Sequence, residues 1–157
     1  MDKERTVKFT LNGEEMERSF PTNLSLLNAL RYELGATEVK NGCEKGDCGA
    51  CVVVVDGQAE NTCCMLAVQA DGKALRTVKG MGSVDSLHPL QEAFIELGAI
   101  QCGFCTPGML CAAEAFLEEY PKPTRQEIKI GISGNLCRCT GYDKIVRAIQ
   151  AVADGGS

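Results

Sequence analysis

Residues 42–51 read Gly42-Cys43-Glu44-Lys45-Gly46-Asp47-Cys48-Gly49-Ala50-Cys51. The three cysteines follow a C-x4-C-x2-C spacing, which is one of the spacings that hold a [2Fe–2S] cluster on cysteine thiolates. Such a cluster with its thiolates is an anion, and glycines allow a loop to turn its backbone N–H groups toward an anion. The stretch therefore predicts a cluster-binding loop, for which Cys63 is the candidate fourth ligand.

Zinc is the alternative for this first site, because four thiolates also suit zinc. Zinc loops usually carry two short C-x2-C pairs, whereas here three cysteines share one glycine-rich loop, so the cluster is the favoured interpretation. Cys64 follows Cys63 directly, and we expect it to be a small, buried apolar residue that points the other way. The sequence alone leaves the roles of these two cysteines exchangeable.

A second group of cysteines lies well downstream. It supplies Cys102-x2-Cys105 and Cys137-x-Cys139, which are four thiolates from two loops. Each pair precedes a segment that we expect to be helical, and a helix N-terminus favours an anionic cluster. Zinc is again the alternative, but beside the first site a second [2Fe–2S] cluster is the simpler interpretation. Cys111, among apolar neighbours, is expected to be a buried thiol.

The segments around the first site predict a small α+β domain. Apolar and polar residues alternate around Asn12-Gly13, and Asp56-Gly57 separates two further strand-like segments; such turns join the strands of β-hairpins. The expected elements are a hairpin at 7–20, a helix at 24–34 with Thr22 or Asn23 as its N-cap, a hairpin at 52–62 and a last strand at 75–78.

The second half of the chain predicts helices that prolines punctuate. Helical spacing covers residues 90–97, 108–120, 124–132 and 142–152. Residues 79–87, with two glycines and two serines, form the natural linker. We therefore expect two domains, residues 1–79 with the first site and residues 80–157 with the second.

The composition restricts the function of this chain of 157 residues. A net charge of −5, 5% aromatic residues and no Trp argue against a nucleic-acid partner. The sequence has no apolar run long enough to span a bilayer, and residues 1–5 lead into strand-like sequence without a signal-peptide core. We therefore expect a cytoplasmic chain with no membrane partner, in which ten cysteines indicate metal ligation or redox chemistry rather than disulfides.

Few other residues suggest chemistry. His88, the only histidine, stands before Pro89 and is expected to begin a helix. The acidic residues at 114, 118 and 119 are expected to form a solvated helix face, and the role of Arg138, between two candidate ligands, stays open. Because the sequence offers no convincing acid–base pair, we assign no catalytic residue to it.

Four stretches carry a resemblance to one family. They are residues 42–51, Leu66-Ala67-Val68-Gln69-Ala70-Asp71-Gly72, Ile100-Gln101-Cys102-Gly103-Phe104-Cys105-Thr106-Pro107-Gly108-Met109 and Ser133-Gly134-Asn135-Leu136-Cys137-Arg138-Cys139-Thr140-Gly141-Tyr142. Over essentially its whole length the chain resembles the small iron–sulfur subunit of the molybdenum hydroxylases, the xanthine oxidase family. Val52 and Cys64 depart from the Thr and Leu that are frequent there, and neither is an expected ligand.

The resemblance implies an α+β chain with an N-terminal, plant-type ferredoxin-like β-grasp domain and a C-terminal four-helix bundle. It implies that one [2Fe–2S] cluster, on the flavin side, is held by Cys43, Cys48, Cys51 and Cys63. It implies that the other, on the molybdenum side, is held by Cys102, Cys105, Cys137 and Cys139. Gln101 matches the family glutamine that hydrogen-bonds the molybdopterin, and Cys139 matches the ligand that lies beside it.

The resemblance also implies an electron-transfer function. Electrons from a molybdopterin-binding large subunit would pass through the two clusters to FAD on a flavin-binding medium subunit, or to another acceptor. Because the sequence stops soon after its last helix, we expect these groups on partner subunits and no substrate chemistry on this chain. The alternatives are a free-standing ferredoxin-like carrier, a zinc scaffold, and a reductase of the same family that runs electrons toward molybdenum.

Overall fold

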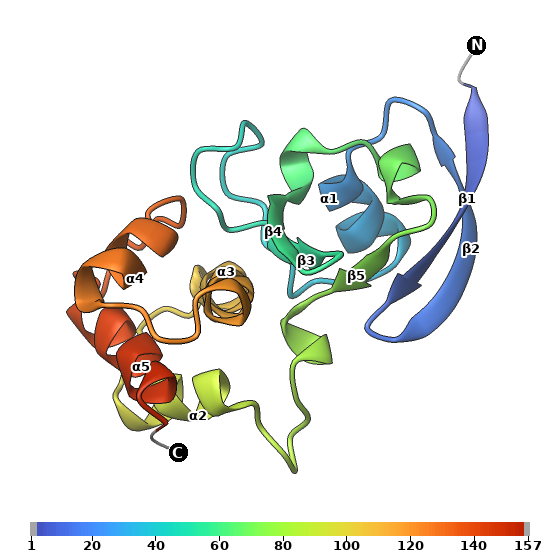
Figure 1. Cartoon of the computed structure of the whole chain (residues 1–157). Helices are drawn as coiled ribbons and strands as arrows, with labels where there is room; N and C mark the ends of the chain where they lie inside the picture. The colour runs from blue at the N-terminus through green and yellow to red at the C-terminus, as the bar shows by residue number, and fades with distance from the viewer. Residues whose placement is uncertain (1–2, 156–157) are drawn as a thin grey trace.

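The structure, a computed structural model, describes residues 3–155. A half that contains a β-sheet and a half made of helices lie side by side (Figure 1). Met1 and Asp2, on which the expectation of a signal-free start partly rests, lie outside the described residues, as do the last two residues of the expected second domain. Within the described range, no helix combines the length and the apolar character needed to cross a bilayer.

The first half contains a mixed five-stranded sheet in the order β2-β1-β5-β3-β4. Its strands are β1 (Glu4–Leu11), β2 (Glu14–Pro21), β3 (Val52–Val55), β4 (Gln58–Asn61) and β5 (Ala74–Arg76). The pairs β1–β2 and β3–β4 are antiparallel, which confirms both predicted hairpins, and β5 runs parallel to β1. Each hairpin turns through two residues with positive φ, Asn12-Gly13 and Asp56-Gly57, as a tight two-residue turn requires.

The helix of the first half begins later than predicted. Ser25, and not Thr22 or Asn23, is the N-cap of α1 (Leu26–Asn28), and its hydroxyl accepts a hydrogen bond from the N–H of Asn28 at 3.2 Å. The helix continues as a π-helical segment, η1 (Ala29–Glu33). The prediction was wrong because the N–H of Thr22 still bonds to the carbonyl of Lys3 at the end of the first hairpin, at 2.9 Å.

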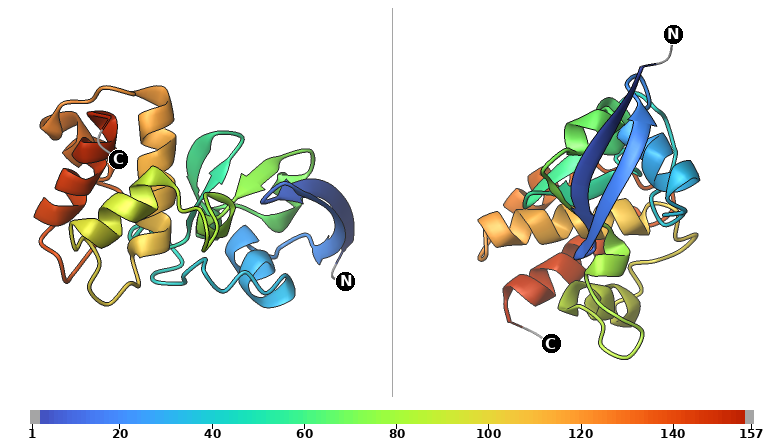
Figure 2. Two further views of the ribbon diagram at one scale, coloured as in Figure 1. Left: turned by 90° about the horizontal axis from the view of Figure 1, so that it is seen from below. Right: turned by 90° about the vertical axis from the view of Figure 1, so that its right-hand side faces the viewer.

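The second half confirms the predicted helices, each with slightly shifted ends. They are α2 (Pro89–Glu96), α3 (Thr106–Glu119), α4 (Arg125–Gly131) and α5 (Asp143–Ala153). His88 begins α2 as expected: its Nδ1 accepts the N–H of Leu90 at 3.2 Å. Apolar residues of all four helices share one core, whereas the β1–β2 hairpin lies at the far end of the molecule (Figure 2).

Helix α3 joins the two halves. Val53 and Val55 belong to the core of the first half, while Val52 and Val54 face the opposite way and pack against α3. Both sides of β3 are therefore buried, which explains its run of four valines. Cys111 lies in this contact and is 1% exposed, so the prediction that it is buried is confirmed. The boundary at residues 79 and 80 stays a prediction, since this small core spans it.

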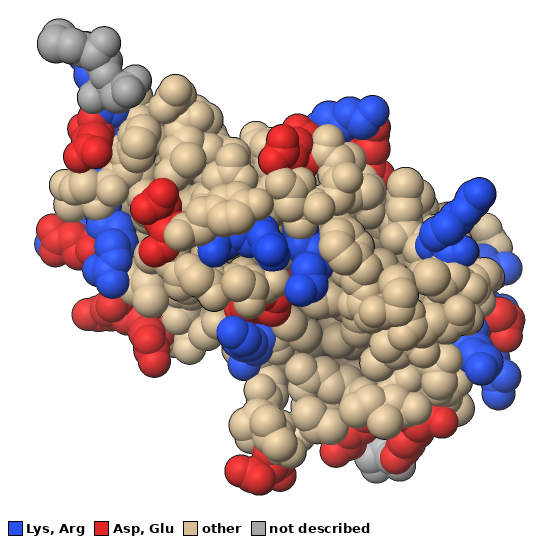
Figure 3. Space-filling model, turned by 180° about the vertical axis from the view of Figure 1, so that it is seen from behind, with Lys and Arg blue, Asp and Glu red and all other residues tan. Residues whose placement is uncertain are grey.

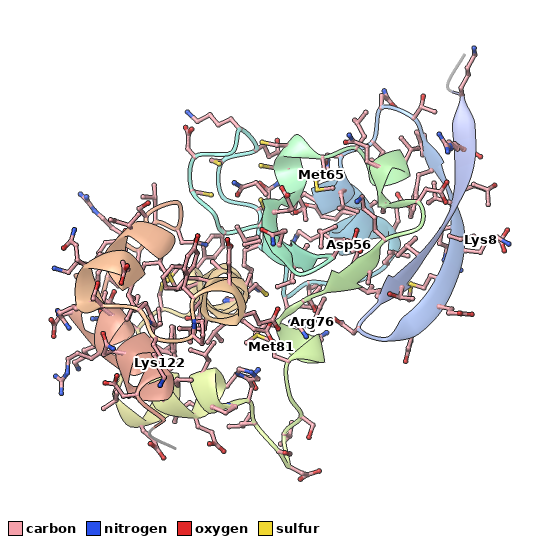
Figure 4. The ribbon with its side chains drawn as sticks, viewed as in Figure 1. Lys8, Asp56, Met65, Arg76, Met81 and Lys122 are labelled. Atoms are coloured by element: carbon pink, nitrogen blue, oxygen red, sulfur yellow. The ribbon has the colours of Figure 1, made fainter. Side chains whose placement is uncertain are left out.

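A charged pair accompanies this contact and corrects one expectation. Glu114 of α3 is 5% exposed, so it does not belong to a solvated face. Its carboxylate lies 3.0 Å from the guanidinium of Arg76, and Arg76 also reaches Glu118 at 3.0 Å. Arg76 and Met81 lie where β5 and the segment after it approach α3 (Figure 4). The helical pattern alone could not show this, because the partner comes from the other half.

The surface charges are mixed. On the face shown in Figure 3, acidic and basic side chains are interspersed around uncharged areas. Exposed ion pairs of the described chain include Arg5 with Asp71 and Lys73 with Asp56, both at 3.1 Å. Exposed pairs of this kind contribute little to stability.

Candidate metal centres

The loop that carries Cys43, Cys48 and Cys51 folds as the glycines suggested, but the glycines serve two purposes. Gly46 and Gly49 have positive φ angles of 83° and 68°, which other residues adopt at a cost. Gly42 is needed for space instead, because a Cβ there would lie 2.8 Å from the Cys48 sulfur. The loop can therefore wrap closely around its own cysteine sulfurs.

Backbone N–H groups point at the sulfurs of this loop. The N–H of Cys48 donates to the Cys43 sulfur at 3.4 Å, and the N–H of Ala50 donates to the Cys48 sulfur at 3.5 Å. Hydrogen bonds from the backbone of Lys45 and Cys48 lower the pKa of Cys43 to about 7. The loop thus stabilises a thiolate at Cys43, which is the form that binds metal.

Cys63 completes the first group of four. It lies in a 3-10 helix (Thr62–Cys64) at the end of β4, where the hydroxyl of Thr62 anchors the segment by donating to the Cys51 carbonyl at 2.8 Å. Burial and the adjacent Cys51 sulfur raise the pKa of Cys63 to about 12, and burial raises that of Cys48. Several crowded sulfurs cannot all be ionised unless positive charge lies between them, so the group suits bound iron.

Cys64 is not where the sequence placed it. It is exposed, and its sulfur lies 3.7 Å from the Cys63 sulfur and against the loop at Gly46. The expectation of a buried residue that points away is therefore wrong. In a strand, two consecutive residues would face opposite sides, but a 3-10 helix turns only about 120° per residue, so the two side chains stay on neighbouring faces.

The second group of cysteines also meets in pairs. The sulfurs of Cys102 and Cys139 lie 3.6 Å apart. Burial, followed by contact with the Cys137 sulfur, raises the pKa of Cys105 to about 12. At Cys137 burial acts in the same direction, but hydrogen bonds from Thr140 and from nearby backbone outweigh it and leave the pKa below its ordinary value. This site therefore contains one sulfur prepared as a thiolate beside others that need a cation.

Helix starts and a strained turn position the second group. Cys105 is the N-cap of α3, as its place before a predicted helix suggested. Tyr142, with a φ of 68°, is the N-cap of α5, and its hydroxyl accepts the N–H of Cys137 at 2.8 Å. Its own N–H donates to the hydroxyl of Thr140 at 3.2 Å. Sequence reasoning missed Thr140 and Tyr142, although both lie in the stretch that carries the resemblance.

The two groups are in direct contact through their loops. The N–H of Leu136 donates to the Cys48 carbonyl at 2.8 Å, and the amide of Asn135 donates to the Gly49 carbonyl at 3.0 Å. Asn135 is 5% exposed. A Cβ on Gly49 would collide with the carbonyl of Gly134, so this contact also requires glycine at position 49. Nothing in the local pattern around Asn135 announces this contact.

The pairing of the thiols bears on which metal fits. Among the proposed ligands, Cys43 contacts Cys48 and Cys51 contacts Cys63 in the first group. In the second group Cys102 contacts Cys139, and Cys105 contacts Cys137. In a [2Fe–2S] cluster each iron takes two protein thiolates, whereas a structural zinc takes four. The arrangement fits two binuclear clusters.

Exposed residues surround the second group. Gln101, Cys102 and Cys139 are exposed, so this site reaches the surface, while Cys51 of the first group is 2% exposed. Large apolar side chains lie exposed on the same loops, among them Phe104 (47%) and Leu136 (56%). Exposed apolar side chains next to a redox site are typical of a docking surface.

Comparisons with known proteins agree with this arrangement. Residues 9–77 match a 2Fe-2S iron-sulfur cluster binding domain, and residues 77–150 match a [2Fe-2S] binding domain. The chain is 48% identical over 145 residues to the nicotinate dehydrogenase small FeS subunit of Eubacterium barkeri, and the match covers 92% of each. It is 44% identical over 146 residues to the xanthine dehydrogenase iron-sulfur-binding subunit of Escherichia coli O157:H7, covering 92% and 91%.

Solved structures show the same similarity. Quinoline 2-oxidoreductase of Pseudomonas putida 86 has a chain that superposes with a TM-score of 0.92 at 43% identity, covering 97% of this chain and 95% of that one. The aldehyde oxidoreductase of Desulfovibrio gigas superposes with a TM-score of 0.91 at 38% identity. That match covers 96% of this chain but only 17% of the much longer enzyme.

Proposed function

The chain belongs to the small [2Fe–2S] iron–sulfur subunits of the molybdenum hydroxylases, and we propose that its two groups of cysteines form one electron path between two partner subunits. The chain is the electron-transfer subunit of a molybdenum-dependent oxidoreductase, and its large partner carries molybdopterin. When bound, each [2Fe–2S] cluster takes up and gives back one electron. The residues of this chain hold the clusters, set their separation and stabilise their charge.

The ligands that we propose are the eight cysteines of the two groups. Cys43, Cys48, Cys51 and Cys63 hold the first cluster, and Cys102, Cys105, Cys137 and Cys139 hold the second. The paired sulfurs and the raised pKa values of Cys63 and Cys105 support this assignment. Cys64 is left out because its neighbour Cys63 has the contact with Cys51. Cys111 is left out because it is buried away from both groups.

The contact between the two loops is the observation that carries the proposal. Cys48 and Cys137 are connected through the hydrogen bond from the Leu136 N–H to the Cys48 carbonyl, at 2.8 Å. Between these two ligands the route consists of covalent bonds and this one hydrogen bond. The two ligand loops are thereby held against each other in a fixed arrangement, which a chain of electron carriers needs and two independent structural metals do not.

The exposed second site is the side that we assign to the molybdopterin subunit. Gln101 and Cys139 are both exposed there, and we propose that the Gln101 amide hydrogen-bonds the pterin while Cys139 lies beside it. Exposed Phe104 and Leu136 would be covered by the same partner. The apolar side chains and the polar amide suit an interface with a buried cofactor edge.

The first site is the side that we assign to a flavin-binding medium subunit. An open hollow of about 430 Å³, lined in part by Asn28, Glu44 and Cys63, lies beside it and would lie toward the acceptor. We further propose that helices α2 to α5 constitute a four-helix-bundle domain, with residues 1–79 as the β-grasp domain. A cytoplasmic location agrees with free thiols that need a reducing compartment.

Low-temperature EPR of the dithionite-reduced protein, with iron and acid-labile sulfide assayed on the same sample, tests the proposal. We expect two distinguishable S = 1/2 signals and about four iron and about four sulfide per chain, as two clusters require. Cys102→Ser should abolish or alter only one signal, and Cys48→Ser only the other. A single signal with bound zinc would contradict the two-cluster path.

A further inference from the structure

In each group of cysteines, a side chain that carries a donor proton lies close to the sulfur of a proposed ligand. At the second site the hydroxyl oxygen of Thr140 lies 3.1 Å from the Cys137 sulfur. At the first site the Cys64 sulfur lies 3.7 Å from the Cys63 sulfur. Neither Thr140 nor Cys64 belongs to the eight proposed ligands. The two contacts differ in donor type and in length.

The direction of the Thr140 contact follows from its other hydrogen bond. The backbone N–H of Tyr142 donates to the Thr140 hydroxyl oxygen at 3.2 Å. That oxygen is therefore already an acceptor, and its own proton is free to point elsewhere. A Cys137 thiolate has no proton and can only accept. The hydroxyl of Thr140 therefore donates to the Cys137 sulfur, and Tyr142 fixes it in place.

The direction of the Cys64 contact follows from the ligand role of Cys63. Once Cys63 is a thiolate, only the thiol of Cys64 carries a proton that can be donated. The Cys64 sulfur lies beside Gly46, where a Cβ added to the glycine would be 2.8 Å from that sulfur. A thiol is a weak donor, and the sulfur-to-sulfur distance is long, so this bond is the weaker of the two.

We propose that Thr140 and Cys64 tune the reduction potentials of the two clusters, Thr140 more strongly than Cys64. The inference rests on the ligand assignment under the proposed function. A cluster becomes more negative when it is reduced, so a donor to one of its sulfurs stabilises the reduced form more than the oxidised form. Each donor therefore raises the potential of its own cluster and leaves the other unchanged.

The decisive measurement is an EPR-monitored redox titration of the iron-loaded protein carrying Thr140→Val or Cys64→Ala. Thr140→Val should lower the reduction potential of one signal. We expect the equilibrium constant of that one-electron reduction to fall by up to about tenfold, which corresponds to about 59 mV. Cys64→Ala should lower the potential of the other signal by a smaller factor, about threefold or less. In each variant the second signal is an internal control and should stay in place.

The variants that keep a donor separate tuning from a structural role. Thr140→Ser retains the hydroxyl and should restore the wild-type potential, while Cys64→Ser supplies a stronger donor and should leave its signal equal or higher. If valine prevents cluster assembly, Thr140→Ala provides the second deletion of the hydroxyl. Unchanged potentials in Thr140→Val and Cys64→Ala would overturn the inference. It would also be overturned if the serine variants lowered the potentials as far as these deletion variants do. If the wild-type protein itself showed only one signal, the ligand assignment on which the inference rests would be overturned instead.

Discussion

The two cysteine groups reach similar ends by different means. The first is formed largely by one loop, in which Cys43, Cys48 and Cys51 follow one another and backbone N–H groups donate to the sulfurs. The second is assembled from two loops that helix packing brings together, and its organising contacts come from the side chains of Thr140 and Tyr142. A local loop depends on backbone freedom, whereas a composite site depends on packing.

This difference predicts where each site is vulnerable. Glycines are critical at the first site, because the loop needs positive φ angles and lets cysteine sulfurs lie close to its backbone. At the second site the vulnerable positions are side chains that fix one loop against another. Position 49 belongs to both classes, since Gly49 has a φ of 68° and also contacts the loop of the second site. The largest effect is therefore expected there.

Gly49→Val should be the most damaging single change at the contact between the sites. A left-handed φ strains valine, and its Cβ would collide with the Gly134 carbonyl and lie within 2.7 Å of the Asn135 amide. We expect the free energy of unfolding to fall by about 2–5 kcal/mol, measured as a lower thermal unfolding temperature of the iron-loaded protein.

Gly134→Ala is the matched control, because nothing lies within 4 Å of a Cβ at that position and its φ is not left-handed. It should unfold close to the wild-type temperature. Equal unfolding temperatures for the two variants would show that Gly49 is not the point at which the loops are fixed.

Asn135→Ala should have an intermediate effect and acts from the side of the second site. It removes the hydrogen bond from the Asn135 amide to the Gly49 carbonyl, which then accepts only the N–H of Val52, at 3.2 Å. We expect the free energy of unfolding to fall by about 0.5–1.5 kcal/mol. We also expect a weaker magnetic interaction between the two reduced clusters in low-temperature EPR, because the loops separate.

The control for this prediction is Asn23→Ala, an amide deletion at an exposed position of the first half. It should change neither the stability nor the EPR line shapes appreciably. A variant at position 135 that kept the wild-type magnetic interaction would argue that Leu136 alone holds the loops together.

His88→Asn should have the smallest effect, and only on the dependence of stability on pH. Burial, followed by the nearby Arg76 guanidinium, holds the pKa of His88 below its ordinary value of 6.5. The folded state therefore binds this proton less readily than the unfolded state. The stabilisation is complete above pH 6.5 and is lost as the pH falls through the lower, folded pKa.

Protonation also removes the acceptor that caps α2, because Nδ1 then carries a proton instead of accepting the Leu90 N–H. Asparagine keeps a cap without titrating, so the variant should lose less stability on acidification, by roughly 0.5–1 kcal/mol. Thermal unfolding of both proteins across the range from about pH 8 to about pH 5.5 measures the difference. Cluster decomposition in acid affects both proteins alike. Parallel curves would contradict the prediction.

The sequence by itself determined the parts of this protein that depend on neighbours along the chain. The C-x4-C-x2-C loop, the two tight hairpin turns and the four helices of the second half were all predicted from local patterns. These features depend on backbone preferences and on hydrophobic periodicity, which a short stretch of sequence contains in full.

Only the tertiary structure decided the features that depend on distant partners. Ser25 became the cap because of the strand before it, Cys64 stayed exposed because of the 3-10 helix, and Glu114 was buried by Arg76 from the other half. The hydrogen bond from Asn135 to Gly49 joins residues 86 positions apart. Such contacts are set by how the two halves pack, and no local preference of either residue encodes them.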